Sequence, residues 1–195
     1  MSEAVYDEAI TTLSYDYDYL LEGNVDQRHA HAALKQLSVF SLLSDYSPIL
    51  VGTVPLDIHI SSSDLDIICE VHHFEHFELL LHNHYGMLKG FRYSYKGVNG
   101  MPRAVCSFNY NGRSIEIFAQ PIPTSEQSGF KHMMIEHRIL KLRGERDKEQ
   151  LRKLKLAGWK TEPAFAMAYK LEGDPYETLL DMYNWSDERL KAFFA

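Results

Sequence analysis

The spacing of apolar and polar residues differs between the two halves of the chain. Short apolar runs or alternating stretches, typical of β-strands, occur at residues 48–52, 64–71, 91–96, 102–110 and 114–120. Helical spacing occurs around them, at residues 1–23, 26–44 and 72–85. Beyond Pro121 and Pro123 the apolar residues follow the helical period alone. We therefore expect an α+β fold, a β-sheet with flanking helices followed by a C-terminal helical segment.

Turn and cap residues indicate where these elements begin and end. Asn111-Gly112 is a strong hairpin signal and should join the last two strands as an antiparallel pair. Asp26 is expected to cap a helix that runs to about Ser44. Further helix starts are expected at Thr124 in a capping box with Gln127, and at Thr161, Asp174 and Ser186.

The chain contains no repeat, linker or low-complexity tract. Its length of 195 residues suits one domain, or one core with a helical appendix. We therefore expect residues 1–195 to form a single compact unit. Within it, the sheet core would occupy residues 24–120, and the helical part, residues 121–195, would pack on that core.

Residues 52–66 contain the most informative polar pattern. Asp64 and Asp66 stand two apart in a strand-like run, so their side chains should share one face while Leu65 points into the core. Two like charges on a mostly buried strand repel each other and are costly to desolvate. Paired carboxylates are also how proteins hold Mg²⁺ for phosphoryl chemistry. Gly52 would let backbone approach a ligand, and Thr53 would add a hydroxyl suited to phosphate.

This stretch resembles the signature of the nucleotidyltransferase superfamily, which has the DNA polymerase β-like fold. That signature is Gly-Ser, ten residues and Asp-x-Asp, and here it stands as Gly52-Thr53, ten residues and Asp64-Leu65-Asp66. The superfamily adds a third carboxylate on a later strand, for which Glu116 is the candidate. The whole chain, including residues 160–165 and 173–176, also resembles a bacterial family of nucleotidyltransferase-like proteins, DUF4269.

The resemblance implies a mixed sheet of the nucleotidyltransferase type and a Mg²⁺-dependent transfer reaction. Asp64, Asp66 and Glu116 would be the catalytic residues and would hold Mg²⁺, expected as two ions. Gly52, Thr53 and Ser63 would contact the NTP substrate, whose base is open. A nucleoside monophosphate would pass to a hydroxyl of an unidentified small-molecule or protein acceptor.

Two alternatives belong to other functional classes. One is a catalytically silent relative that binds a nucleotide or a protein partner, including an antitoxin-like role. It is motivated by the lack of any Lys or Arg between Gly52 and Asp66, where relatives often have a basic residue near the phosphates. The other is a glycosyltransferase, since these enzymes also use Asp-x-Asp with a metal. The early Gly-Thr and the helical C-terminal half argue against it.

Basic residues gather later in the chain. Residues 1–90 contain 3 Lys or Arg against 14 Asp or Glu, whereas residues 131–160 contain 10 against 4. This segment is either a solvated helix face or the source of cations for the phosphates. Lys160 and Thr161 stand at an expected helix start, which favours an anion. His132 and Glu136, one helical turn apart, are weaker candidates to activate an acceptor hydroxyl.

Composition limits the remaining choices. The net charge of −7 argues against a broad nucleic-acid surface, so nucleic acid is not the expected partner. No apolar run is long enough to span a membrane, and the acidic N-terminus does not resemble a signal peptide, so a cytoplasmic location is expected. The histidines between His72 and His84 could bind a metal, but a surface helix rich in histidine is the simpler interpretation.

Overall fold

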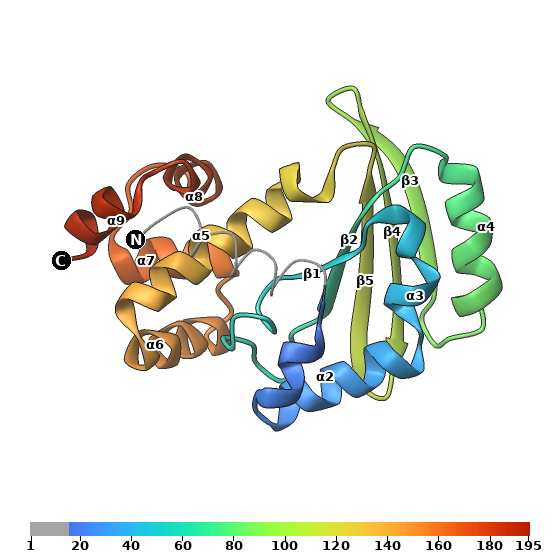
Figure 1. Cartoon of the computed structure of the whole chain (residues 1–195), viewed down its shortest axis with the longest axis horizontal. Coiled ribbons are helices and arrows are strands. Elements are labelled where there is room, and N and C mark those ends of the chain that lie inside the picture. Colours follow the sequence, from blue (N-terminus) through green and yellow to red (C-terminus); the bar gives the residue numbers. More distant parts are fainter. Residues whose placement is uncertain (1–15) are drawn as a thin grey trace.

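The computed structural model describes residues 16–195. It confirms an α+β architecture in which a five-stranded sheet lies between two groups of helices (Figure 1). Most of the helix expected at residues 1–23 lies outside the described residues. Within them, the end of that segment forms a short 3-10 helix, η1 (Asp18–Glu22).

The sheet is mixed and has the strand order β1-β2-β5-β4-β3. Its strands are β1 (Ile49–Val51), β2 (Leu65–Glu70), β3 (Arg92–Val98), β4 (Met101–Tyr110) and β5 (Arg113–Gln120). β2 and β5 pair in parallel, and every other neighbouring pair is antiparallel. The two central strands therefore run side by side in the same direction although 42 residues separate Glu70 from Arg113.

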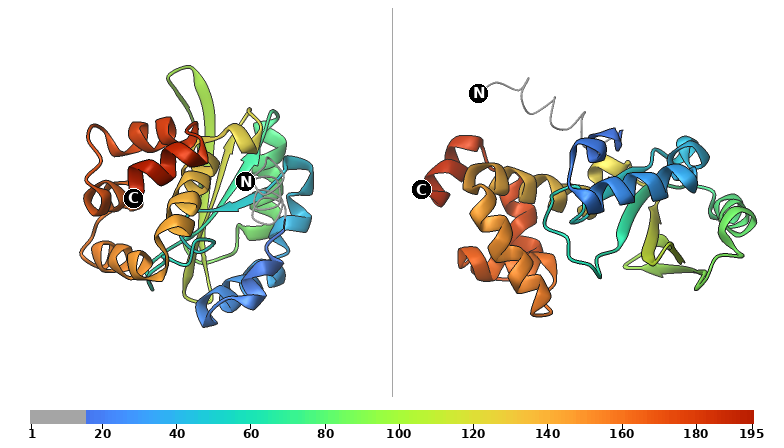
Figure 2. Two further views of the ribbon diagram at one scale, coloured as in Figure 1. Left: turned by 60° about the vertical axis from the view of Figure 1, so that its left-hand side comes forward. Right: turned by 90° about the horizontal axis from the view of Figure 1, so that it is seen from below.

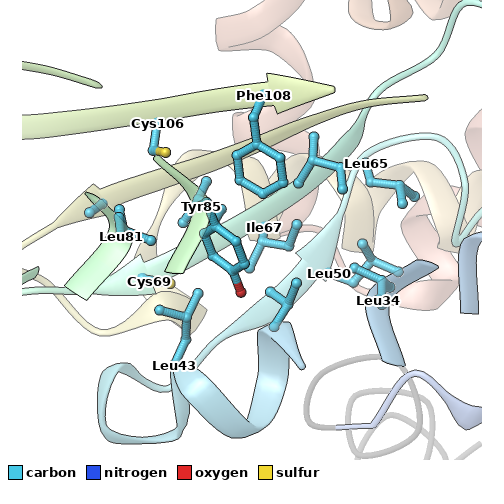
Figure 3. Close-up of a cluster of buried hydrophobic side chains, with 14 of the residues drawn as sticks. Leu34, Leu43, Leu50, Leu65, Ile67, Cys69, Leu81, Tyr85, Cys106 and Phe108 are labelled. Atoms are coloured by element: carbon cyan, nitrogen blue, oxygen red, sulfur yellow. The ribbon is translucent and has the colours of Figure 1, made fainter. Parts of the chain in front are cut away.

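One face of the sheet carries the first hydrophobic core. Alternate residues of the central strands, such as Ile67 and Ile117, point to this face and are fully buried. Figure 3 shows Leu65, Ile67 and Phe108 beside Leu34 of one covering helix and Tyr85 of another. The helices that supply this cover are α2 (Val25–Gln36), α3 (Val39–Leu42) and α4 (Phe74–Tyr85), with η2 (Ser44–Tyr46) between α3 and β1.

The second hydrophobic core is formed mainly by the C-terminal helices. These are α5 (Ser128–Arg143), α6 (Glu145–Leu156), α7 (Thr161–Tyr169), α8 (Pro175–Tyr183) and α9 (Asp187–Phe194). Their buried residues join Ile49, Val51 and Ile68 of the sheet edge. Gly129 of α5 faces this sheet edge, and a Cβ added there would make an ordinary van der Waals contact with Ile68 Cγ2 at 3.6 Å. Figure 2 shows α8 and α9 at one end of the molecule and α4 at the other.

The helix expected from Asp26 to Ser44 is wrong in both its start and its continuity. Asn24 is the N-cap, and its side chain and that of Gln27 form a reciprocal capping box. The helix ends at Gln36, because Ser38 adopts a left-handed conformation with φ of 54°. The apolar spacing continues across this break, since α3 packs on the same face of the sheet.

The capping box expected between Thr124 and Gln127 is also wrong. Thr124 instead begins a 3-10 turn, η3 (Thr124–Glu126), and Gln127 is the N-cap of α5 without a side-chain cap bond. The buried Gln127 side chain donates hydrogen bonds to the carbonyls of Cys69, at 2.9 Å, and Ile122, at 3.2 Å. It therefore ties the start of α5 to the end of β2.

Other turn and cap predictions are confirmed. Asn111 and Gly112 form the β4–β5 hairpin turn with positive φ angles of 48° and 79°. Asp174 and Ser186 cap α8 and α9 through their side chains. No helix among residues 16–195 is long and apolar enough to cross a membrane.

Candidate functional site

A pocket of about 670 Å³ lies between the second face of the sheet and the C-terminal helices. The sheet contributes residues of β2 and β5, the loop after β1 contributes Gly52, Thr53 and Ser63, and α5 and the α6–α7 connection supply the other wall. All ten residues selected from the sequence line it, namely Gly52, Thr53, Ser63, Asp64, Asp66, Glu116, His132, Glu136, Lys160 and Thr161. Residues from five separate segments thus meet at one place.

The acidic residues of the pocket come from two adjacent strands. Asp66 of β2 and Glu116 of β5 are register partners, so their side chains leave the sheet on the same face. Ile67 and Ile117 beside them are fully buried on the opposite face. Asp64 directly precedes β2 and lines the same pocket. Local sequence patterns did not show that these two strands are neighbours. Their adjacency was expected from the family resemblance, and it is confirmed.

Two carboxyl groups of this site, those of Asp66 and Glu116, have raised pKa values. Burial raises the pKa of Asp66 from 3.8 to about 7, with further contributions from the negative charges of Glu116 and Asp64. Burial and the charge of Asp64 also raise the pKa of Glu116. Lys155 and Lys160 oppose the shift at Asp66. The site thus concentrates more negative charge than its own cations neutralise.

Gly52 lies against the Asp66 carboxylate. Its φ is 81°, and a Cβ at this position would stand 2.5 Å from Asp66 Oδ2. A side chain here would meet both backbone strain and a direct clash. Glycine therefore leaves the space beside the carboxylate open to a ligand.

The loop after Gly52 is a series of turns, and it contains no helix. The backbone N–H of Ile58 donates to the Thr53 carbonyl at 3.1 Å, and Thr53 itself is buried. The Ser63 hydroxyl accepts a hydrogen bond from the Ile60 N–H at 3.0 Å. Ser63 therefore shapes this loop while it also lines the pocket.

Cations reach the pocket from α6 and from the connection that follows it. Lys155, near the end of α6, donates a hydrogen bond to Thr161 Oγ1 at 3.1 Å. Lys160, and not Thr161, is the N-cap residue of α7, so the expected cap is wrong by one position. The Thr161 side chain makes no cap bond because Thr161 is already the first helical residue. Its hydroxyl accepts from Lys155 instead.

The two weaker candidates on α5 differ in their surroundings. His132 Nε2 donates to the Tyr176 carbonyl at 3.0 Å, and His132 Nδ1 lies 3.5 Å from Glu162 Oε1. Both ring nitrogens thus have protein partners. His132 is therefore poorly placed to take the proton from the hydroxyl group of an acceptor. Glu136 is 3% exposed. Burial, and then the charge of Glu162, raises the pKa of Glu136 well above its ordinary value.

Lys155, Arg103 and Trp159 are among the pocket residues that were not selected from the sequence. Lys155 belongs to the basic segment, but the sequence does not show which of its cations turns inward. Arg103 and Val105 stand two apart on β4, so their side chains point to the same face of the sheet. Strand alternation could therefore have placed Arg103 on the pocket face. Trp159 follows the helix-ending Gly158, and this position alone gives no functional signal.

The acidic residues suit a hard divalent cation. Among residues 16–195, no three His, Cys, Asp or Glu side chains are already gathered as metal ligands, and this includes the histidines near α4. However, Asp64, Asp66 and Glu116 present oxygen ligands whose mutual repulsion a cation would reduce. The open space beside Gly52 adjoins Asp66 Oδ2. Both properties fit Mg²⁺.

Comparison with solved structures identifies the fold. Cid1, an RNA terminal uridylyl transferase, matches with a TM-score of 0.53 and 13% identity over 78% of this chain. The MgGTP-bound structure of Cid1 poly(U) polymerase gives 0.53 and 14% over 86%. Cid1 in complex with the UTP analogue UMPNPP gives 0.52 and 15% over 87%. The chain spans about half the length of these proteins, with 51%, 55% and 54% covered.

At these identities, the similarity establishes a nucleotidyltransferase-like fold, as the sequence predicted. Because Cid1 is an RNA terminal uridylyl transferase and a poly(U) polymerase, the comparison does not support the expected exclusion of nucleic acid. No curated protein sequence matches the chain. The sequence profile described as a domain of unknown function (DUF4269) matches residues 32–182, and the protein belongs to this family.

Proposed function

We propose that this protein is a nucleotidyltransferase that moves a nucleoside monophosphate from an NTP to a hydroxyl of a small-molecule or protein acceptor. The observation that carries the proposal is the register pairing of Asp66 with Glu116, beside Asp64, in a pocket bordered by Gly52. The nucleotidyltransferase-like fold supports it by analogy, and the residues of the pocket carry the argument.

Asp64, Asp66 and Glu116 would hold Mg²⁺, which we expect as two ions. Mg²⁺ bound there would neutralise phosphate charge and polarise the α-phosphoryl group. Lys155 and Lys160 would meet the remaining charge of the triphosphate from the opposite wall. They supply the positive charge that the loop between Gly52 and Asp66 lacks, which weakens the main argument for a silent relative.

Gly52 and Thr53 would position the triphosphate near the carboxylates. The absent side chain at Gly52 lets a ligand approach Asp66 closely. The turn hydrogen bond from the Ile58 N–H to the Thr53 carbonyl fixes the backbone on which the Thr53 hydroxyl is carried. Such positioning lowers the entropy cost of bringing the acceptor and the phosphorus together.

The reaction would form one P–O bond and break another. The acceptor hydroxyl oxygen bonds to the α-phosphorus, and the bond between that phosphorus and the oxygen bridging to the β-phosphate breaks. Pyrophosphate leaves with the electron pair of the broken bond. The hydroxyl proton passes to solvent water as the new bond forms.

The experiment is a transfer assay with four α-labelled NTPs, Mg²⁺ and three acceptor sources: a small-molecule extract, RNA, and protein. We expect the wild type to transfer label to the small-molecule or the protein source, with pyrophosphate released in equal amount. Transfer to RNA alone would contradict the proposed acceptor class. The Asp66→Asn variant should fold but transfer none. Equal label transfer by both proteins would overturn the proposal. Nucleotide binding without transfer to any source would favour the silent, partner-binding alternative.

A further inference from the structure

Glu136 is a buried acid in the pocket that the transfer chemistry does not use. It lies on α5, is 3% exposed and lines the pocket. Its Oε1 atom has no hydrogen-bond partner among the described residues. An unpaired polar atom in a buried position is uncommon in folded proteins, so a ligand is a natural candidate for its missing partner. The terminal torsion of glutamate is soft, so either carboxyl oxygen can turn toward the pocket.

The charged groups around Glu136 come from two other helices. Glu162 of α7 raises its pKa, and Lys155 of α6 lowers it, but burial is the dominant cause and the net direction is upward. Lys155 is also coupled electrostatically to Asp66, so it interacts with both the buried acid and the proposed metal site. The upward shift of its pKa favours the neutral form of Glu136, which offers one O–H donor and one carbonyl acceptor.

Trp159 supplies a flat apolar surface to the same pocket. It stands in the α6–α7 connection, lines the pocket, and remains 41% exposed. Its neighbour Lys160 acts electrostatically on Asp66 and Glu116. An aromatic ring beside a phosphate-binding cation suits a stacked nucleobase, because every base offers a π-face.

We propose that Trp159 and Glu136 form the base-recognition subsite of this pocket, with Trp159 stacking on the base and Glu136 hydrogen-bonding to the amino edge of adenine or cytosine. This inference rests on the proposed function and names its substrate class. The triphosphate would extend toward Lys155 and Lys160, while the base would reach the buried acid on α5.

The preference for an amino edge follows from the donor and acceptor of a neutral carboxyl. Adenine and cytosine each place an amino donor beside a ring nitrogen that accepts. The Glu136 carbonyl oxygen would accept from the amino group, and its O–H would donate to the ring nitrogen. Hypoxanthine and uracil replace these groups with a carbonyl and an N–H, so their acceptor is the less basic carbonyl oxygen.

The test uses two nucleotide pairs that differ at this edge: ATP with ITP, and CTP with UTP. Dissociation constants are measured with Mg²⁺ for the wild type, Glu136→Met and Glu136→Gln. We expect the wild type to bind the amino member of at least one pair about tenfold more tightly, equivalent to one good hydrogen-bonded contact. Glu136→Met should lose this preference. Glu136→Gln, which retains one donor and one acceptor, should keep it.

Trp159→Leu tests the stacking surface separately. This variant should bind all four nucleotides more weakly. Its binding of inorganic tripolyphosphate should be unchanged, because tripolyphosphate has no base. Equal wild-type affinities within both pairs would overturn the inference, and so would an unchanged preference in Glu136→Met. In either case nucleotide binding would stand, and the transfer assay would still decide the proposed function. If the wild type binds none of the nucleotides, the proposed function itself fails and the inference fails with it.

Discussion

Asp66 of β2 and Glu116 of β5 stand directly opposite each other across a parallel pair of strands. Parallel register puts both side chains on the same face of the sheet. Burial and the charge of Glu116 raise the pKa of Asp66, and burial and the charge of Asp64 raise the pKa of Glu116. This arrangement costs folding free energy in the absence of a ligand. Sites that work on charged substrates often carry such a cost, because the ligand relieves it.

The first prediction concerns the pH dependence of stability. The folded-state pKa of Asp66 is about 7 against an ordinary value of 3.8. Between these values the folded chain binds more protons than the unfolded chain, so the free energy of unfolding falls as pH rises. The total loss is up to about 4 kcal/mol. Asp66→Asn has no carboxyl to ionise and should therefore be more stable than the wild type at pH 8 without divalent cations.

Thermal unfolding from pH 4 to pH 8 in the presence of a chelator measures this difference. The stability advantage of Asp66→Asn should shrink as pH falls toward 4, because the folded carboxyl is then protonated and the unfolded carboxyl approaches its ordinary pKa of 3.8. Glu116→Gln should show the same direction of change. A variant that is less stable at pH 8, or an advantage independent of pH, would show that Asp66 is not strained by its surroundings.

The second prediction concerns Gly52. Gly52→Ala should destabilise the protein by about 1–3 kcal/mol through its left-handed backbone and should also weaken nucleotide binding. The matched control is Gly100→Ala, because Gly100 has a φ of 79° but nothing within 4 Å of an added Cβ. Gly100→Ala should lose stability without losing affinity. If both variants bind nucleotide equally well, then the approach of Gly52 to Asp66 has no role in binding.

The third prediction concerns the cations of the α6–α7 connection. Lys160→Met should weaken NTP binding at least fivefold, because one charge-assisted contact with phosphate is worth about 1 kcal/mol or more. Its effect on unfolding should be small, since Lys160 is exposed and makes no side-chain cap bond. Lys153→Met, an exposed substitution on α6 outside the pocket lining, is the control. Equal nucleotide affinities for the two variants would remove Lys160 from the site.

The fourth prediction concerns Asp57, which fastens the loop after Gly52 to its surroundings. Its carboxylate lies 3.1 Å from Arg152 Nη2 and 3.5 Å from Lys148 Nζ on α6. It also accepts a hydrogen bond from Asn24 Nδ2 at 2.7 Å. Asp57→Asn removes the charge but tolerates the left-handed backbone at this position, where φ is 56°.

We expect Asp57→Asn to lower the free energy of unfolding by about 1–2 kcal/mol and to weaken nucleotide binding, because the loop that carries Thr53 is less firmly held. A double-mutant cycle with Arg152→Met measures the coupling. Additive effects of the two substitutions would mean that the Asp57–Arg152 pair contributes nothing to stability.

The sequence predicted most of the carboxylate cluster because local rules determine it. Side chains alternate along a strand, so those of Asp66 and Ile67 point to opposite faces of the sheet. The Asn111-Gly112 hairpin turn marks where the strand that carries Glu116 begins. The parallel pairing of β2 with β5 is different in kind. It joins strands far apart in the chain, so only the resemblance to a known superfamily could supply it.

The positions that sequence reasoning missed depend on packing between elements. Lys155 is one of several cations on a basic helix, and only the docking of α6 decides that it faces the pocket. Ser38 breaks a helix whose apolar spacing continues unchanged on both sides of the break. Gln127 stands in a sequence context typical of helix capping. Its buried side-chain amide instead donates a hydrogen bond to the carbonyl of Cys69, which is distant in the sequence. Local periodicity carries no information on such contacts.

The most direct measurement of the central claim is a thermal-shift comparison of wild type and Asp66→Asn with Mg²⁺ and each of ATP, GTP, CTP and UTP. A ligand that binds only the folded state stabilises it by about 2.7 kcal/mol at a hundredfold excess over Kd. The account predicts that at least one nucleotide raises the midpoint of the wild type and that none does so for Asp66→Asn. Cooperative melting of both proteins with no shift, or equal shifts in both, would contradict a carboxylate-dependent nucleotide site.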